Sequence, residues 1–218
     1  MIVVSMTTEE VYREIMRDFV SIKSRSHFEG NILQKEMLRK RLQSERRTIC
    51  YTTPYRNEWT IIFELDPKGI KTAYYLKSYD SKGMVAYMIQ FINAGTRQED
   101  KFVIKYTRHF FDRYNERMGL GFTETSKVVK HFFKNNFEYD LGHSEVLSNG
   151  IRCTHFIFKE GIGIGWQHDA KKTLQIKTFV SNNTLSASQR SLAEHIKHGG
   201  DDDEFKQVVK VKNLLKAF

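Results

Sequence analysis

The sequence predicts an α+β fold, in which helices pack on one face of an antiparallel sheet and the N-terminal half contributes both helices and strands. Two observations predict it. Apolar residues recur at helical spacing over residues 8–47 and again over residues 107–133, and each region is followed by short apolar runs separated by turn residues. The chain has 218 residues, of which 40% are hydrophobic, so a core can form without disulfide bonds.

The N-terminal region has the pattern of two helices. A threonine before Glu9 and Glu10 is a typical helix start, and apolar residues follow at intervals of three or four (Val11, Ile15, Phe19 and Ile22). A second, separate helix is predicted over Ile32–Arg47. We interpret its basic residues as a solvated helix face, with a docking surface as the alternative. This helix has an inward apolar face (Leu33, Met37, Leu38, Leu42) and an outward basic face (Lys35, Arg39, Lys40, Arg41, Arg46, Arg47).

Strands are predicted next, over Thr48–Thr53, Glu58–Leu65 and Ile70–Ser78. The last two are joined by Asp66-Pro-Lys-Gly69, which places proline and glycine as a β-turn requires. The run Met84–Ile92 fits either a helix or a strand, because a short apolar run does not distinguish them.

The best candidate for a linker is Asn93–Asp100, which is polar and contains a glycine. We therefore predict three regions. Residues 1–98 form a helix pair with antiparallel strands, residues 99–198 form an α+β domain, and residues 199–218 form an acidic hinge and a basic helix.

The second half is more regular. A strand over Lys101–Tyr106 leads into a helix that runs from Thr107 to Met118 and stops at a glycine. Thr123-Glu-Thr-Ser126 then has the composition of a helix cap. Three strands with turns at Gly161 and 169–172 complete an antiparallel meander (Ile151–Lys159, Ile162–His168 and Thr173–Ser181).

Net charge and cysteine content indicate the class of binding partner and the cellular compartment. The net charge is +9, with an excess of +3 in residues 1–100 and +6 in residues 101–218, which favours a polyanion such as nucleic acid or phosphate. The two cysteines, Cys50 and Cys153, are too few for a disulfide framework and indicate free thiols in a reducing compartment. No secretion signal is recognisable and the longest apolar stretch, residues 84–92, is too short for a bilayer, so we expect a cytoplasmic location and no membrane partner.

The most informative segment is the predicted helix Thr107–Arg117. It places His109, Arg113 and Arg117 at positions i, i+4 and i+8, and Glu116 at i+7, so one face carries an imidazole, two guanidiniums and a carboxylate. Metal-independent RNA cleavage needs a proton carrier and cations at the phosphate, which these side chains can supply. The alternative is an ordinary surface helix held by ion pairs between neighbouring turns.

The meander offers partners for this face. Lys177 or Thr178 would face a phosphate, and His168 would complete the site from the hairpin. Strand alternation predicts that Gln175, Lys177 and Phe179 share one face, and that Ile176, Thr178 and Val180 share the other. In the alternative interpretation, Lys177 simply lies in solvent on a half-buried strand.

Other motifs exclude some chemistries. Gly161-Ile-Gly-Ile-Gly165 is not followed by a helix or a Walker lysine, so it predicts a strand that another element approaches closely rather than a nucleotide loop. No histidine, cysteine and carboxylate spacing typical of a metal site is present, and His195 and His198 are only weak metal candidates. We expect no metal and no cofactor.

The region 101–181 resembles the small ribonuclease-toxin group of the barnase, EndoU, colicin and RelE type, and the small mobile-element domains allied to it. The shared pattern is a strand, a helix with a His-x3-Arg-x3-Arg face (His109, Arg113, Arg117), a second helix, and a meander ending near Lys177-Thr-Phe179. The resemblance implies an RNA-directed function with His109 and the arginines in the site. It does not extend to the N-terminal half, and a shared fold alone does not imply activity.

The first hypothesis is therefore a metal-independent ribonuclease or toxin-like RNA-directed protein. His109 would be the general base or acid, Arg113 and Arg117 would hold phosphate, and Glu116 would orient one of these groups. One alternative is a non-catalytic module that binds nucleic acid or protein. The other is a structural or assembly protein, which a large apolar patch on the N-terminal helices would favour.

Overall fold

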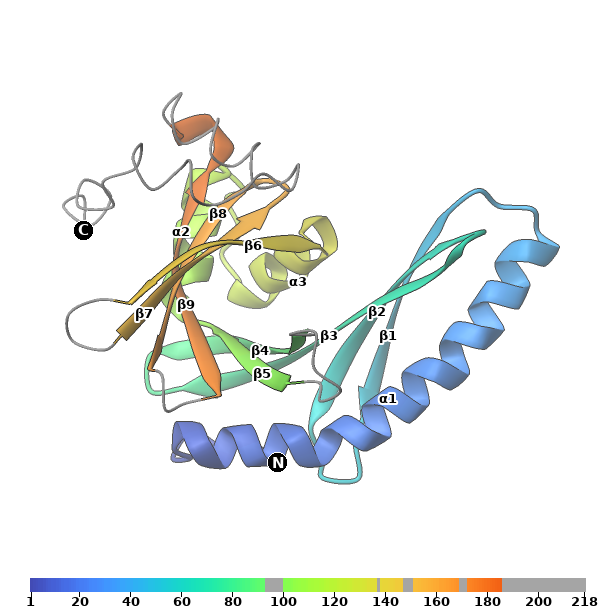
Figure 1. The fold of residues 1–218 in the computed structure, drawn as a ribbon, viewed down its shortest axis with the longest axis horizontal. Helices are drawn as coiled ribbons and strands as arrows, with labels where there is room; N and C mark the ends of the chain where they lie inside the picture. The colour runs from blue at the N-terminus through green and yellow to red at the C-terminus, as the bar shows by residue number, and fades with distance from the viewer. Residues whose placement is uncertain (93–99, 137, 147–150, 169–171, 186–218) are drawn as a thin grey trace.

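In the computed structural model, nine strands form one mixed sheet in the order β1-β2-β3-β4-β5-β9-β8-β7-β6 (Figure 1). The structure describes residues 1–92, 100–136, 138–146, 151–168 and 172–185. The elements are α1 (Thr8–Arg39), β1 (Glu45–Thr52), β2 (Glu58–Asp66), β3 (Gly69–Asp80), β4 (Gly83–Ile92), β5 (Asp100–Tyr106), α2 (Arg108–Arg117), α3 (Thr125–Asn135), β6 (Tyr139–Val146), β7 (Ile151–Phe158), β8 (Gly161–His168), β9 (Thr173–Ser181) and a 3₁₀ turn (Asn182–Thr184).

The predicted α+β class is confirmed, and the sheet has a specific topology. Strands β1 to β5 pair antiparallel in chain order, as do β6 to β9. The two meanders meet at β5 and β9, which are parallel, with Val103 opposite Thr173 and Tyr106 opposite Ile176. A parallel pair needs a long crossover, which the chain supplies with α2, α3 and the three strands that precede β9.

Helices cover both faces of the first meander. Alternation along β2 sends Trp59, Ile61 and Phe63 into the cluster that contains the α1 residues, and Ile62 into the cluster that contains α2 and α3. In Figure 1, α1 therefore runs along one side of β2 and β3, while α2 and α3 lie in the angle between the two meanders. Side chains at alternate positions of the same strand therefore pack into two separate hydrophobic cores, one on each face of the sheet.

The prediction of two N-terminal helices is wrong, because α1 is one helix of 32 residues. Thr7 and Glu10 form a capping box at its start. Gly30 lies within this helix and does not break it. It is buried against β2 and β3, where a Cβ would lie 3.2 Å from Ile70, so a glycine allows the helix to approach the sheet closely. The helix ends at Arg39, and Glu45–Arg47, which the pattern predicts as helical, belong to β1; the rest of β1 lies within the predicted strand Thr48–Thr53.

The apolar residues assigned to that second helix explain the error. Met37 is fully buried, but Leu38 is 52% exposed and Leu42 is 38% exposed. The apparent periodicity was therefore partly a surface feature, and pairing with β2 determines the structure of Glu45–Arg47 instead.

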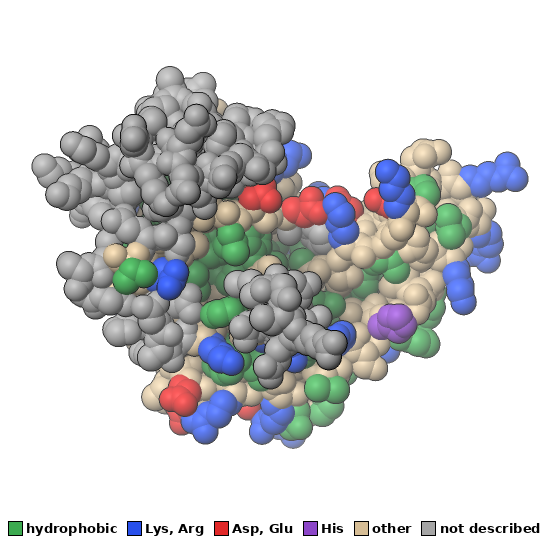
Figure 2. All heavy atoms as spheres, in the orientation of Figure 1, with side chains coloured by type: hydrophobic (Ala, Val, Ile, Leu, Met, Phe, Trp, Pro, Cys, Tyr) green, Lys and Arg blue, Asp and Glu red, His purple; other side chains and the backbone are tan. Residues whose placement is uncertain are grey.

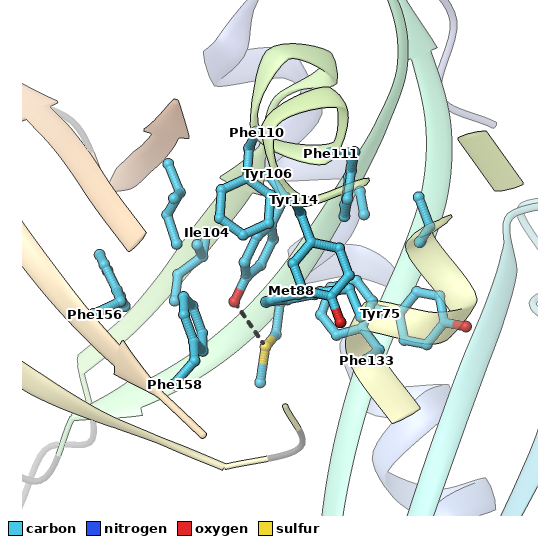
Figure 3. Packing of buried hydrophobic residues seen from close by; sticks show 14 of the residues in the cluster. Tyr75, Met88, Ile104, Tyr106, Phe110, Phe111, Tyr114, Phe133, Phe156 and Phe158 are labelled. Atoms are coloured by element: carbon cyan, nitrogen blue, oxygen red, sulfur yellow. Dashed lines mark hydrogen bonds between the residues drawn. The ribbon is translucent and has the colours of Figure 1, made fainter. Parts of the chain in front are cut away.

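An aromatic cluster holds α2 and α3 against the sheet (Figure 3). The Tyr106 ring lies 5.3 Å from the Phe110 ring and 5.1 Å from the Phe133 ring, and its hydroxyl donates to the Met88 sulfur at 3.7 Å. Edge-to-face contacts of this kind contribute about 0.5–1.5 kcal/mol per pair beyond the area that they bury. Because Met88 lies on β4 and Tyr106 on β5, this core spans the predicted boundary at residues 98 and 99.

Several predictions fall outside the described residues. They are the linker residues 93–99, the turn residues 169–171, and the acidic hinge and basic helix of 199–218, together with His195 and His198. On either side of the linker, β4 and β5 are hydrogen-bonded neighbours, with Ile92 opposite Asp100. Within the described ranges, no helix is both long enough and apolar enough to cross a bilayer.

Candidate functional site

The helix α2 presents the predicted face. The Thr107 hydroxyl caps it by accepting from the Phe110 amide at 3.3 Å, and the same hydroxyl donates to the Ile176 carbonyl at 3.1 Å. Phe110, Phe111 and Tyr114 are fully buried on the side of α2 that faces the sheet. The remaining side carries the predicted polar face, in which His109 and Glu116 are exposed and Arg113 and Arg117 are half-buried.

Ion pairs and a backbone contact hold the two arginines. Arg113 Nη1 lies 2.8 Å from Glu116 Oε2, and Arg117 Nη1 donates to the Phe179 carbonyl of β9. Burial lowers the pKa of the Arg117 guanidinium, and the positive charge of the neighbouring Arg113 lowers it further. Arginine nevertheless stays charged at neutral pH. An exposed pair such as Arg113–Glu116 contributes only about 0–1 kcal/mol, so a phosphate can displace the carboxylate at little cost.

His109 is not tied to another side chain of the candidate site within the described ranges. Its imidazole is exposed and forms no hydrogen bond or ion pair within the described ranges. The structure brings Arg113, Glu116 and Arg117 together on α2, and leaves His109 one turn away from them, facing solvent.

The strand β9 does not complete this site as expected. The register with β8 places Ile164 opposite Thr178 and Gly165 opposite Ile176, so Lys177 is a bulge residue without a partner on β8. The bulge reverses the alternation, and Ile176 and Phe179 therefore both enter the core beneath α2. The predicted grouping of Lys177 with Phe179 on one face is wrong for this reason.

Lys177 and Thr178 are consequently separated from His109. The Lys177 ammonium lies 5.3 Å from the Trp166 ring centre. Trp166 follows Gly165, which faces the core beside Leu174 and Phe156, so Trp166 and Lys177 lie on the opposite side of the sheet from α2. Thr178 is 3% exposed, and its hydroxyl has no hydrogen-bond partner among the described residues. His168 ends β8, and its side chain lies outside the described part of the chain.

Sequence reasoning missed a polar cluster behind α2. The Tyr114 hydroxyl donates to Glu160 Oε2 at 2.5 Å and lies 3.0 Å from His131 Nδ1, and Asn136 Nδ2 donates to the same carboxylate oxygen at 2.7 Å. Burial and the Glu160 carboxylate raise the pKa of Tyr114 well above its ordinary value, so the phenol stays neutral. The cluster ties α2, α3 and the β7–β8 turn together. These residues come from three separate segments, and no local motif marks them.

A cleft lies between the two meanders. It has a volume of about 770 Å³ and is lined by β1–β4, α3, β6 and β7. Lys71 and Glu138 pair across its rim at 2.5 Å, and Arg46 pairs with Glu64 at 2.5 Å. Figure 2 shows a hollow floored by hydrophobic side chains, with acidic and basic side chains at its edge. The cleft carries both signs of charge, and the described residues contain no group of three or more metal-binding side chains.

Comparison with protein-family models, curated proteins and solved structures gave no match to this chain. The resemblance to the ribonuclease-toxin group therefore stays a prediction.

Proposed function

We propose that the protein binds RNA through phosphate contacts and does not cleave it. One observation carries the proposal: α2 holds two guanidiniums on a surface fixed by packing, and the exposed His109 imidazole on the same helix forms no hydrogen bond or ion pair with the described residues. The buried aromatic side of α2 and the Thr107 cap fix the helix, so the arginines need little further ordering when they meet an anion.

Cleavage would need more than this face offers. A metal-independent mechanism uses one group to remove the 2′-hydroxyl proton and another to protonate the leaving oxygen. Of the expected partners, Lys177 lies on the far side of the sheet and the Thr178 hydroxyl is buried. Binding to RNA phosphates needs only the cations, and the net charge of +9 favours association with a polyanion.

The test is a fluorescence-anisotropy titration of a labelled mixed-sequence RNA over a range of salt concentrations, with a chelator present. We expect log K to fall linearly with log salt, and the slope to decrease by about one unit in Arg113→Gln. His109→Ala should leave binding nearly unchanged. Lys130→Gln, which removes an exposed charge from α3, is the matched control. Wild-type protein that binds no RNA at low salt contradicts the proposal. Cleavage that is lost in His109→Ala restores the ribonuclease hypothesis.

We propose contact with a second copy of the chain as another function, on the evidence of α1. Phe28 is 58% exposed and Ile32 47%, and both lie on the part of the helix turned away from its core-facing residues. Arg25–Glu29 and Glu36–Lys40 pairs beside this stripe offer both signs of charge to an antiparallel copy. Light scattering tests it: a dimer that Phe28→Ser converts to a monomer supports it, and a monomer at high concentration contradicts it.

A further inference from the structure

A second cavity lies on the α1 side of the sheet, away from α2. It has a volume of about 610 Å³ and lies between α1, β3 and the first residues of β5. Two lysines from different elements line it. The Lys101 ammonium of β5 is 4.8 Å from the centre of the Phe19 ring, and the Lys23 ammonium of α1 is 5.9 Å from the same ring. Both cations therefore lie around one aromatic side chain.

The charge in this groove is not neutralised by the described residues. Neither Lys23 nor Lys101 forms an ion pair with them, and no aspartate or glutamate is among the described side chains that line the cavity. This contrasts with the cleft on the other face, where Glu64 and Glu138 pair with the basic residues. An aromatic ring attracts an exposed cation only weakly, so both ammonium groups keep most of their capacity to bind an anion.

Polar groups stand beside the two lysines. Ser26 Oγ and the Tyr74 hydroxyl are 3.0 Å apart, and His27 Nε2 is 3.1 Å from Asn31 Nδ2. Burial raises the pKa of Tyr74, so its hydroxyl remains a neutral hydrogen-bond donor. Phosphate oxygens accept hydrogen bonds from ammonium, hydroxyl and amide groups, and the described side chains of the groove supply all three.

We propose that this groove is a phosphate-binding site that contacts the RNA backbone, with Lys23 and Lys101 as the main contacts. The inference rests on the proposed RNA-binding function, and it adds a site on the face of the sheet opposite α2. The two lysines, projecting from α1 and β5 over one ring, would engage neighbouring phosphates of a single strand, while His27 and the hydroxyl groups would give secondary contacts.

The test compares two double variants that remove the same charge. Lys23→Gln with Lys101→Gln empties the groove of its cations, and Lys77→Gln with Lys130→Gln removes two lysines that lie outside it. In the RNA titration described above, we expect the groove variant to bind more weakly at each salt concentration. Its salt slope should fall by about one to two units, with little change in the control. Melting temperatures close to that of the wild type establish that both variants are folded.

The outcomes separate this inference from the proposed function. Equal losses in the two double variants, or a loss in Arg113→Gln with none in the groove variant, overturn the groove as a site. If wild-type protein binds no RNA, the proposed function fails, and inorganic phosphate becomes the probe. Stabilisation of the wild type by phosphate that disappears in the groove variant then supports a site for free phosphate, and stabilisation that persists, or none at all, overturns it.

Discussion

Substitution of Gly163 tests whether the glycines of β8 exist to admit large neighbouring side chains. A Cβ at this position would lie 2.6 Å from Cε2 of Phe158 and 3.2 Å from Cγ2 of Ile176. Carbon atoms in good contact are about 3.5–4.0 Å apart, so the Phe158 ring must retreat by about 1 Å in Gly163→Ala. That ring is 1% exposed and its centre is 5.1 Å from the Phe132 ring, so it has little space into which to move.

The expected loss of stability follows from two opposing terms. Overpacking a dense core costs about 1–3 kcal/mol, and replacing glycine with alanine returns about 0.4–1 kcal/mol through the unfolded chain. We therefore expect Gly163→Ala to lower the free energy of unfolding by about 1–2 kcal/mol and the melting temperature by about 2–8 °C. The measurement is urea denaturation, in which the midpoint should fall while the slope m stays constant.

Gly69 gives the matched control. Apart from its own residue and its two chain neighbours, no described residue has an atom within 4 Å of a Cβ built there, so Gly69→Ala should be neutral or slightly stabilising. A further variant, Phe158→Leu, makes space for the new methyl group, and Gly163→Ala should cost less in that background than in the wild type. If Gly163→Ala has the same midpoint as Gly69→Ala, the steric explanation of the glycine pattern is wrong.

Two other predictions concern stability. Asp18 Oδ2 accepts hydrogen bonds from Asn57 Nδ2 at 2.7 Å and from Trp59 Nε1 at 2.8 Å. Asp18→Ala leaves these two buried donors unpaired, so it should lower the free energy of unfolding in urea by about 2–5 kcal/mol. A loss below about 1 kcal/mol contradicts this account. Burial raises the pKa of Tyr87 from 10.0 to about 12. The folded state therefore holds the phenol proton more tightly than the unfolded state, and this stability is complete below pH 10 and is lost as the pH rises through 12. Unfolding free energies measured over that range should decline less steeply in Tyr87→Phe than in the wild type, and parallel curves would refute the assignment.

The elements that were predicted correctly are those that depend on nearby residues. The period of Phe110, Phe111 and Tyr114 predicts α2, and the strands β7 to β9 follow from apolar runs and turns. The strand β6 was missed because it is an edge strand rich in polar residues, and such edges need little apolar surface. The parallel pairing of β5 with β9 joins residues about seventy apart, and no local pattern encodes it.

The candidate site was predictable on α2 and not beyond it. Helical spacing correctly places His109, Arg113 and Arg117 on one polar face. The position of Lys177 depends on a bulge, and a bulge depends on the register between two strands, which the sequence of β9 alone does not determine.

The joint between β5 and β9 has a consequence for how the chain reaches its fold. All the other neighbouring strands in the sheet are consecutive in sequence. Both meanders can therefore assemble as successive hairpins, from contacts between neighbouring segments of the chain. Closing the sheet instead requires β9, near the end of the described chain, to find β5. Loop-closure entropy makes such distant pairing slow. Until it occurs, β5 offers an unpaired edge, and during synthesis that edge is complete before β9 has been translated. This interval is the period in which the chain is most open to pairing with another copy of itself.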